Sequence, residues 1–305
     1  MTQTSAPTPP KSEKQNQHFI PRWWLKAFAD RGGNIWALQG DQVQVVGAGS
    51  VMSADWIYTL FDSWWRPSDA VEDGLSKIEG TASRLFRNIE ASGAAGDEDW
   101  SALLWFIALT ACRHPTTMDR SVELSKELGV FLSEVKTYPD GAAFETAFES
   151  RFGSKPPVDM HPILSSLPQR TIDGSILKLL ELQPYDPSMP QTDALLATDD
   201  VAAVMRSMDC RLLTAPAGAY YVLGDRPLPA KDVAHGFTIP LSKTLALEAS
   251  PGSSSTGARS SAEATADEIE ASNLAQVQRA ERTVIGPDRE ALRSLAPPPE
   301  KKVKR

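Results

Sequence analysis

Cysteine is scarce in this sequence. Only Cys112 and Cys210 occur among 305 residues, and each lies in an apolar run. Thiols in such runs act as small buried hydrophobes, which suits a reducing compartment. We therefore expect a cytoplasmic protein without a zinc finger.

Positive charge is also in the minority, since 31 Lys and Arg residues face 39 Asp and Glu residues, for a formal net charge of -8. Nucleic acids and membrane surfaces attract proteins through clustered Lys and Arg. Broad nucleic-acid binding and membrane binding are therefore not expected, whereas an acidic surface favours a basic protein partner. The basic run at 301–305 follows three prolines and is expected to be a solvated tail.

Long hydrophobic runs and the familiar catalytic motifs are missing as well. Residues 1–15 lack the apolar stretch of a secretory signal, and no later run approaches the roughly 20 apolar residues that span a bilayer. The sequence has no Gly-x-Gly-x-x-Gly, Walker, Gly-x-Ser-x-Gly or His-Glu-x-x-His motif. We therefore expect neither export, nor a membrane span, nor a nucleotide cofactor, nor a serine hydrolase.

Helical periodicity dominates the middle of the chain. Apolar residues recur at three- and four-residue steps from Val71 to Ile89, and Asp69 with Glu72 resembles a capping box at the start of that helix. The next helix, from about 97 to 112, is apolar on every face and should be the buried centre of the core. Further helices are expected at 118–136, 140–152, 172–182, 193–207 and 267–282.

Strand-like patterns lie at both ends of this helical region. A turn at Gly40-Asp41 separates two short runs and predicts a β-hairpin over 34–46. Runs at 210–214, 219–223 and 237–247 predict a small C-terminal antiparallel sheet, in which Pro240 favours an edge or a strand start. The fold class is therefore α+β, with a mostly α-helical core, an N-terminal β-hairpin and a small C-terminal antiparallel sheet.

Composition divides the chain into one domain and its flanks. We expect a disordered leader at 1–15, a single α+β domain from 16–249 plus 266–293, a serine-rich low-complexity linker at 250–265 and a disordered basic tail at 294–305.

The opening of this domain carries an unusual motif. Gln17-His18-Phe19-Ile20-Pro21 is followed by Trp24-Leu25-Lys26-Ala27-Phe28, and further matches come at Glu72, Glu79, Arg113, Gly224-Asp225-Arg226-Pro227, 239–242 and Asn273. In these residues the chain resembles a bacterial family, the domain of unknown function 4238. The resemblance covers nearly the whole expected domain and implies no accepted activity.

His18, Glu72 and Glu79 are the first candidates for chemistry. Imidazole titrates near neutrality and is the commonest metal ligand, but His18 can equally be a buried histidine that ties down the N-terminal segment. Glu72 and Glu79 lie seven residues apart on one side of a helix, where two carboxylates can hold a divalent cation or act as general acid and base. Alternatively, Glu72 completes the capping box and Glu79 pairs with a surface cation.

Arg113, Asp225 and Asn273 complete the candidate set. Arg113 follows an apolar run, so its guanidinium either clamps an anionic ligand or satisfies the last carbonyls of its own helix. Asp225 follows a strand, where it acts either as a catalytic acid or as the acceptor of an Asx turn. Asn273 bridges to the same site or caps a buried strand. His114, His161 and His235 have no partners at metal-ligand spacing and are taken as incidental.

Two hypotheses follow. In the first, the protein is a hydrolase for a phosphate-bearing or other anionic substrate, with His18, Glu72, Glu79 and Asp225 as catalytic groups and with Arg113 and Asn273 as substrate-binding groups. A divalent metal ion would then be held by His18, Glu79 and Asp225. In the second, the same residues form a buried polar network in a non-catalytic binding or immunity-type protein. Solvent access distinguishes the two.

Overall fold

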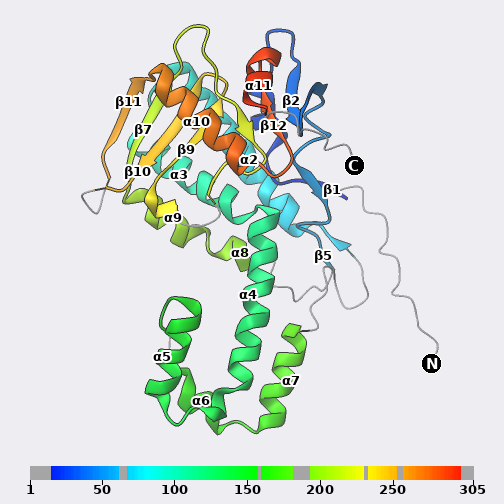
Figure 1. Cartoon of the computed structure of the whole chain (residues 1–305), viewed down its shortest axis with the longest axis vertical. Helices are drawn as coiled ribbons and strands as arrows, with labels where there is room; N and C mark the ends of the chain where they lie inside the picture. Colours follow the sequence, from blue (N-terminus) through cyan, green and yellow to red (C-terminus); the bar gives the residue numbers. More distant parts are fainter. Residues whose placement is uncertain are drawn as a thin grey trace, which may run out of the picture.

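The computed structural model describes residues 15–61, 67–156, 159–180, 193–229, 233–252 and 257–296. Two four-stranded sheets are the main β-structure of the protein (Figure 1). The strands are β1 (Asn16–His18), β2 (Ile35–Gln39), β3 (Gln42–Val46), β4 (Ser53–Asp55), β5 (Leu60–Phe61), β6 (Pro67–Ser68), β7 (Asp209–Thr214), β8 (Leu223–Gly224), β9 (Phe237–Ser242), β10 (Leu245–Ser250), β11 (Arg259–Glu263) and β12 (Val284–Gly286). The helices are α1 (Arg22–Lys26), α2 (Ala70–Ser92), α3 (Asp97–Cys112), α4 (Pro115–Ser133), α5 (Gly141–Phe152), α6 (Met160–Ser166), α7 (Gln169–Leu180), α8 (Asp193–Leu196), α9 (Thr198–Arg206), α10 (Ala266–Arg279) and α11 (Arg289–Leu295). The expected α+β class is confirmed.

The C-terminal sheet has the strand order β11-β7-β10-β9. Strands β7, β10 and β9 pair antiparallel, and Ala246 of β10 lies opposite both Leu213 and Pro240. Pro240 therefore belongs to an edge strand, where its missing N–H costs no ladder bond. The prediction for this proline is confirmed. The predicted run at 237–247 covers two strands, β9 and most of β10, while the predicted run at 219–223 does not join this sheet, because its last residue belongs to β8, which pairs with β12 in the other sheet.

The second sheet has the order β3-β2-β12-β8 and contains the predicted hairpin. Gln39 pairs with Gln42 across a two-residue turn in which Gly40 has a φ of 64°, a left-handed conformation that glycine adopts without strain. Strand β12, from the end of the chain, pairs with β2, so the sheet joins residues near both ends of the sequence.

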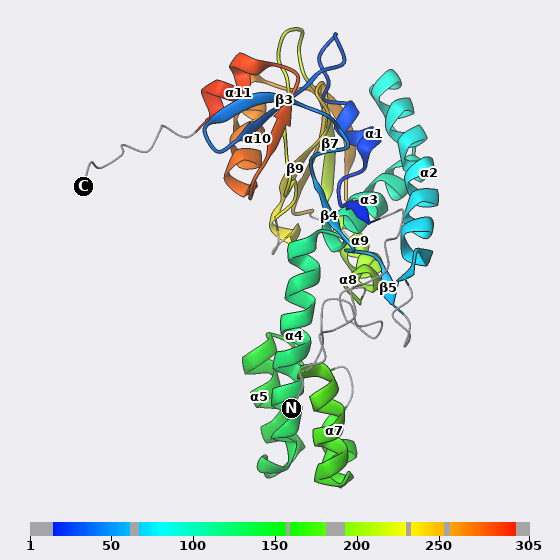
Figure 2. The ribbon, with the colours of Figure 1, turned by 90° about the vertical axis from the view of Figure 1, so that its right-hand side faces the viewer.

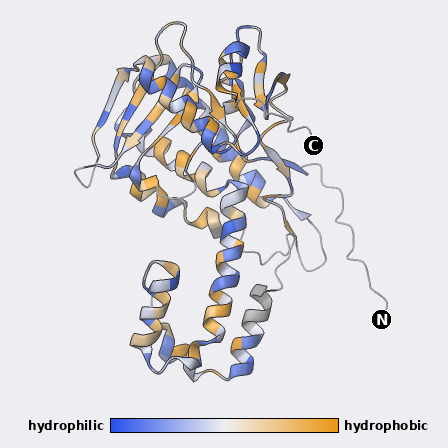
Figure 3. Ribbon diagram, in the orientation of Figure 1, coloured by the Kyte–Doolittle hydropathy of each residue, from blue (hydrophilic) through white to orange (hydrophobic). Residues whose placement is uncertain are grey.

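Helices cover both sides of the strands. Figure 2 shows α10 and α11 on one side and α1, α2 and α3 on the other. Helix α3 is buried along most of its length, as its uniformly apolar sequence predicts, and its hydrophobic character is visible in Figure 3. Trp23 and Trp24 of α1 pack against Phe86 of α2 and Phe106 of α3, with ring centroids 5.0–5.9 Å apart. These aromatic contacts fix the three helices to one another.

Several short elements differ from the expectations. Asp69 precedes α2 but its side chain makes no capping hydrogen bond, so the predicted capping box is wrong. Strand β11 lies inside the expected linker and pairs parallel with β7, and α6 lies inside an expected connection. Helix α11 reaches Leu295, two residues into the expected tail. The leader at 1–14 and the tail from 297 lie outside the described residues.

Helices α4 to α7 project from the two sheets (Figure 1). They contain a separate hydrophobic cluster of Phe131, Val135, Phe144, Phe148 and Ile172. The main core contains none of these five residues. The expected single domain stays a prediction, to which the structure adds a second centre of packing. Among the described helices, none combines the length and the apolar character needed to cross a bilayer.

Candidate functional site

Arg113 lies at the end of α3 and is fully buried, with 0% of its side chain exposed. Its Nε donates to the backbone oxygen of Phe19 at 2.9 Å, its Nη2 to that of His18 at 2.8 Å and its Nη1 to Oε1 of Glu79 at 2.8 Å. The guanidinium thus joins α3 to α2 and to the segment after β1. All three of its nitrogen atoms are used within the protein.

Tyr58 and Gln17 extend this network. The Tyr58 hydroxyl donates to the backbone oxygen of Arg113 at 2.9 Å, and the Arg113 guanidinium lies 5.7 Å from the Tyr58 ring centroid. Burial raises the pKa of Tyr58, which keeps the hydroxyl protonated as a donor. Gln17 is buried, donates to Thr59 Oγ1 and accepts from the Tyr58 amide. The network therefore holds the first strand of the protein against its core.

His18 enters the network through its backbone, and its imidazole faces Arg22. Nε2 of His18 accepts from Nε of Arg22 at 2.7 Å, while Nδ1 is buried without a well-formed hydrogen bond. Burial and the charge of Arg22 lower the pKa of His18, and this effect outweighs that of the Met52 and Val51 backbone, which favours the charged form. Because Nε2 accepts from Arg22, the proton of the neutral ring is on Nδ1. The imidazole is therefore neutral near neutral pH, with Nδ1 protonated.

Both carboxylates of α2, Glu72 and Glu79, act on the charge of Arg113. Glu79 pairs directly with it and keeps 22% of its side chain exposed. Burial opposes the charge of Arg113, but Tyr58, Glu79 and Glu72 outweigh this effect and raise the pKa of the guanidinium. Four predicted residues therefore gather at one place: His18, Glu72, Glu79 and Arg113.

Asp225 and Asn273 make other contacts. The buried Asp225 carboxylate accepts from the amides of Glu281, Arg282 and Thr283 at 2.8–2.9 Å. Asn273 of α10 accepts from the amide of Val222 and donates to the oxygen of Tyr220, both at 2.9 Å. Both side chains therefore hold backbone segments in place, and their hydrogen bonds are to residues outside the Arg113 network.

The candidate metal ligands do not form a ligand set. In the part of the chain that the structure describes, no three His, Cys, Asp or Glu side chains gather as a group that could hold a metal ion. The oxygens of Asp225 are taken by amides, and Glu79 is paired with Arg113. A divalent ion held by His18, Glu79 and Asp225 stays a prediction without geometric support.

His114 has a larger structural role than its turn-like context predicts. It caps α4, with Nδ1 accepting from the Thr116 amide at 3.3 Å, and its Nε2 lies 3.0 Å from the backbone oxygen of Asp225. These contacts require a proton on Nε2 and none on Nδ1. Burial lowers the pKa of His114. The imidazole is therefore neutral and links α4 to the Asp225 segment.

This arrangement predicts a loss of stability in acid. Because the pKa of His114 is lowered on folding from its ordinary value of 6.5, the unfolded chain holds more protons between the two values. We expect the free energy of unfolding to fall as the pH drops below about 6.5, with His114 contributing at most about 1.4 kcal/mol per pH unit. Urea unfolding at several pH values measures this slope.

The matched variant for this test is His114→Asn, because asparagine also caps helices but does not titrate. We expect a smaller slope in the variant, even if it is less stable at every pH. His18 contributes to the same slope, so His18→Asn is the second arm. An unchanged slope in both variants contradicts the assignment.

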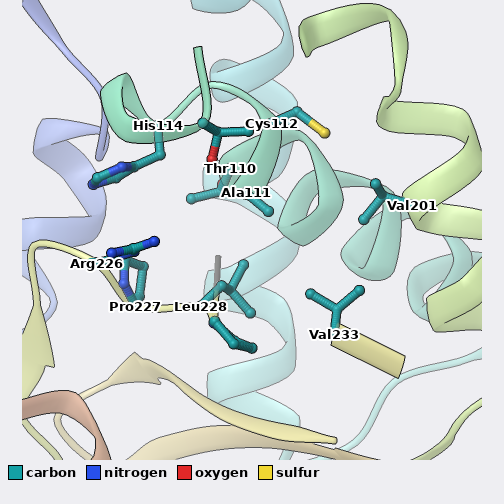
Figure 4. A pocket seen from close by; sticks show the side chains of 11 residues that line it. Thr110, Ala111, Cys112, His114, Val201, Arg226, Pro227, Leu228 and Val233 are labelled. Atoms are coloured by element: carbon teal, nitrogen blue, oxygen red, sulfur yellow. The ribbon is translucent and has the colours of Figure 1, made fainter. Parts of the chain in front are cut away.

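A cavity of about 130 Å³ lies beside His114 and Arg226 (Figure 4). We call it the α3 cavity. Its lining comes from the end of α3, the start of α4, α9 and the residues around 226–229: Thr110, Ala111, Cys112, His114, Thr117, Val201, Arg226, Pro227, Leu228, Pro229 and Val233. An engineered cavity of similar size, about 150 Å³, holds benzene. The α3 cavity can therefore take a small organic molecule.

The two ends of the α3 cavity differ in character. Figure 4 shows the side chains of His114 and Arg226 facing each other at one end, with Val201 and Val233 at the other. Nη1 of Arg226 pairs with Glu281 at 3.3 Å, which leaves further N–H groups of the guanidinium for a ligand. Such a cavity fits a molecule with one anionic and one apolar end.

The polar groups at the α3 cavity are suited to binding. Both ring nitrogens of His114 are engaged, and Thr110 Oγ1 donates to the oxygen of Phe106. Burial raises the pKa of the Cys112 thiol, which keeps it protonated and unreactive at neutral pH. Arg226 is therefore the group of this lining best placed to interact with an anion.

His114 and Arg226, the two polar residues at one end of the α3 cavity, each follow a candidate residue from the sequence analysis. Arg113 is followed by His114, and Asp225 is followed by Arg226. The buried residue of each pair fixes the backbone, and the next residue lines the cavity. In the sequence, His114 was marked only by its place next to Arg113, whereas Arg226 is also part of the Gly224-Asp225-Arg226-Pro227 motif.

Comparison with known proteins gives one match. The chain belongs to the family described as "Protein of unknown function (DUF4238)", whose model matches residues 16–290. This confirms the resemblance seen at the Gln17-His18 opening. No curated protein and no solved structure matches the chain.

Proposed function

We propose that the protein binds a small organic anion in the α3 cavity without converting it. The observation that supports this most is that the α3 cavity has a cationic end, formed by the Arg226 guanidinium, and an apolar end, formed by Val201 and Val233. A carboxylate accepts bidentate hydrogen bonds from arginine, and its apolar body gains free energy by leaving water. The ligand class is therefore a small aliphatic or aromatic monocarboxylate.

Binding is favoured over catalysis by the state of the predicted catalytic groups. Arg113 is sealed from solvent, Asp225 is occupied by three amides and Asn273 by two backbone groups. A buried network whose donors and acceptors are used within the protein stabilises the fold and has no free group for catalysis. This is the non-catalytic alternative derived from the sequence, now with a cavity assigned to it.

Hydrolysis of a phosphate-bearing or other anionic substrate is the second candidate function. It is favoured by Glu79, which keeps part of its side chain exposed, and by Glu72 on the same helix, since both carboxylates act on the charge of Arg113. A cytoplasmic location is part of either proposal. It is supported by two free, buried cysteines. A basic protein partner stays an expectation from the net charge alone.

Calorimetric titration with benzoate, butyrate and the neutral benzyl alcohol tests the proposal. We expect the two carboxylates to bind and Arg226→Met to weaken them about tenfold or more, because a charge-assisted hydrogen bond contributes about 1.5–3 kcal/mol. Val201→Phe should also reduce binding by filling the cavity. Arg293→Met is the control, since Arg293 is an exposed arginine that pairs with Glu290 and does not line the cavity.

Arg226→Met and a further variant, Glu79→Gln, separate binding from hydrolysis. Release of nitrophenol from p-nitrophenyl phosphate, lost in Glu79→Gln but kept in Arg226→Met, would favour the hydrolase. Equal affinity for benzoate in wild type and Arg226→Met would exclude Arg226 as the anion-binding group.

A further inference from the structure

A second cavity, of about 610 Å³, opens between β2 and α11. We call it the β2–α11 cavity. It lies where α11 packs on the β2–β3 hairpin (Figure 1), and its lining comes from five separate segments: Asp30, Arg31, Gly32, Trp36, Tyr220, Lys243, Thr244, Pro287, Asp288 and Arg289. It shares no lining residue with the α3 cavity.

The charge of this lining is opposite to that of the whole chain. Three cations line it, against two carboxylates, so the local balance is one positive charge in a chain of net charge -8. Among the described residues, none of the three cations forms an ion pair within 4 Å. The cations are Arg31, Lys243 and Arg289.

The two carboxylates already have backbone and side-chain partners. Asp30 accepts from the amides of Gly32 and Asn34 and from the Asn34 side chain, at 2.7–3.3 Å. Asp288 caps α11 by accepting from the Ala291 amide at 2.7 Å. Asp30 shapes the turn that carries Arg31, and Asp288 caps the helix that begins at Arg289. Neither acid pairs with these cations, which stay available for an external anion.

Lys243 is held in position by the protein. Its Nζ donates to the backbone oxygen of Ala29 at 2.6 Å, and its backbone oxygen accepts from the Tyr221 amide at 2.9 Å. Three donors belong to an ammonium group, so at least one remains for a ligand. A fixed cation loses little side-chain entropy on binding.

Aromatic side chains stand beside the cations. The Arg289 guanidinium lies 5.5 Å from the Trp36 ring centroid, a cation–π contact that orients it over the indole. Tyr220 lines the same cavity, and the amide of Asn273 fixes its backbone. Flat apolar surface and positive charge therefore meet in one open cavity.

We propose that the β2–α11 cavity binds an aromatic phosphate monoester, a ligand with a flat ring and a doubly charged phosphate. Arg31, Lys243 and Arg289 bind the phosphate, since guanidinium groups match its oxygens with parallel hydrogen bonds. Trp36 and Tyr220 provide the surface for the ring. The proposal is independent of the α3 cavity, whose single available arginine and apolar end fit a monocarboxylate.

Calorimetric titration of the full chain with phenyl phosphate, inorganic phosphate and phenol tests this site. We expect phenyl phosphate to bind most tightly and its affinity to fall as NaCl is raised, because salt screens exposed charges. Arg289→Met and Arg31→Met should each weaken phenyl phosphate about tenfold or more. Both residues are exposed, so the variants should fold.

Two control variants make the test specific. Arg293→Met removes an arginine from the same helix α11 outside the cavity, and Arg226→Met removes the arginine of the α3 cavity. Both should bind phenyl phosphate like wild type. Equal weakening by Arg289→Met and Arg293→Met would overturn the site. Binding of inorganic phosphate as tight as that of phenyl phosphate would overturn the role of the ring.

Discussion

Replacing Arg113 with methionine should cost about 3–5 kcal/mol of unfolding free energy, the range found when one partner of a buried ion pair is removed. The substitution leaves Glu79 without its cation and the backbone oxygens of His18 and Phe19 without their donor. Urea unfolding followed by tryptophan fluorescence measures this loss. Among the substitutions considered, this one should have the largest effect.

A double variant and a control show how much of this loss comes from the unpaired Glu79 carboxylate. Arg113→Met combined with Glu79→Leu should recover part of the loss, because no unpaired carboxylate remains. Arg84→Met is the control, since Arg84 is exposed on α2 and donates a hydrogen bond to Thr81 of the same helix, and it should stay within about 0.5 kcal/mol of wild type. A loss below about 1 kcal/mol in Arg113→Met would show that the network is not a determinant of stability.

Replacing Asp225 with alanine should cost about 3 kcal/mol or more. The backbone amides of residues 281–283 lose their acceptor at once. The Thr283 bond is buried and the other two are partly buried, and a buried donor left without a partner costs about 1–3 kcal/mol. Thermal and urea unfolding measure the change. The position of β12, which follows directly, should be disturbed as well.

Asp225→Asn is the informative companion to the alanine variant. The amide keeps the shape of the side chain but presents an NH₂ group to backbone donors, so we expect it to lose nearly as much stability. Asp288→Asn is the matched control, because asparagine replaces aspartate well at a helix N-cap. Normal stability combined with lost turnover in Asp225→Asn would instead identify a catalytic acid.

Local patterns in the sequence predicted most of the larger elements. The stripe from Val71 to Ile89 and the uniformly apolar run at 97–112 became α2 and α3, and the Gly40-Asp41 turn became a two-residue hairpin. These signals depend on residues a few positions apart. Strand β11 was missed, because a serine-rich segment becomes an edge strand only through its pairing with β7 about 50 residues earlier.

In the candidate site, too, short-range patterns were predictive and long-range contacts were not. A charged residue after an apolar helix must find partners, which correctly marked Arg113 as a buried group. The acceptors of Arg113 and the donors to Asp225 lie 34–95 and 56–58 residues away, so no spacing rule reveals them. The sequence did not identify His114 and Arg226 as cavity residues, because the cavity that they line exists only after folding.

The N-terminal segment depends on residues that a ribosome makes much later. Trp24 donates from its indole to the oxygen of Pro240, 216 positions later, and β2 pairs with β12. Closing such long loops is slow, and the early helices must wait with exposed apolar faces until the final strands emerge. A nascent chain stalled before residue 240 would therefore carry an incomplete core, and it would be a natural target for chaperones and proteases.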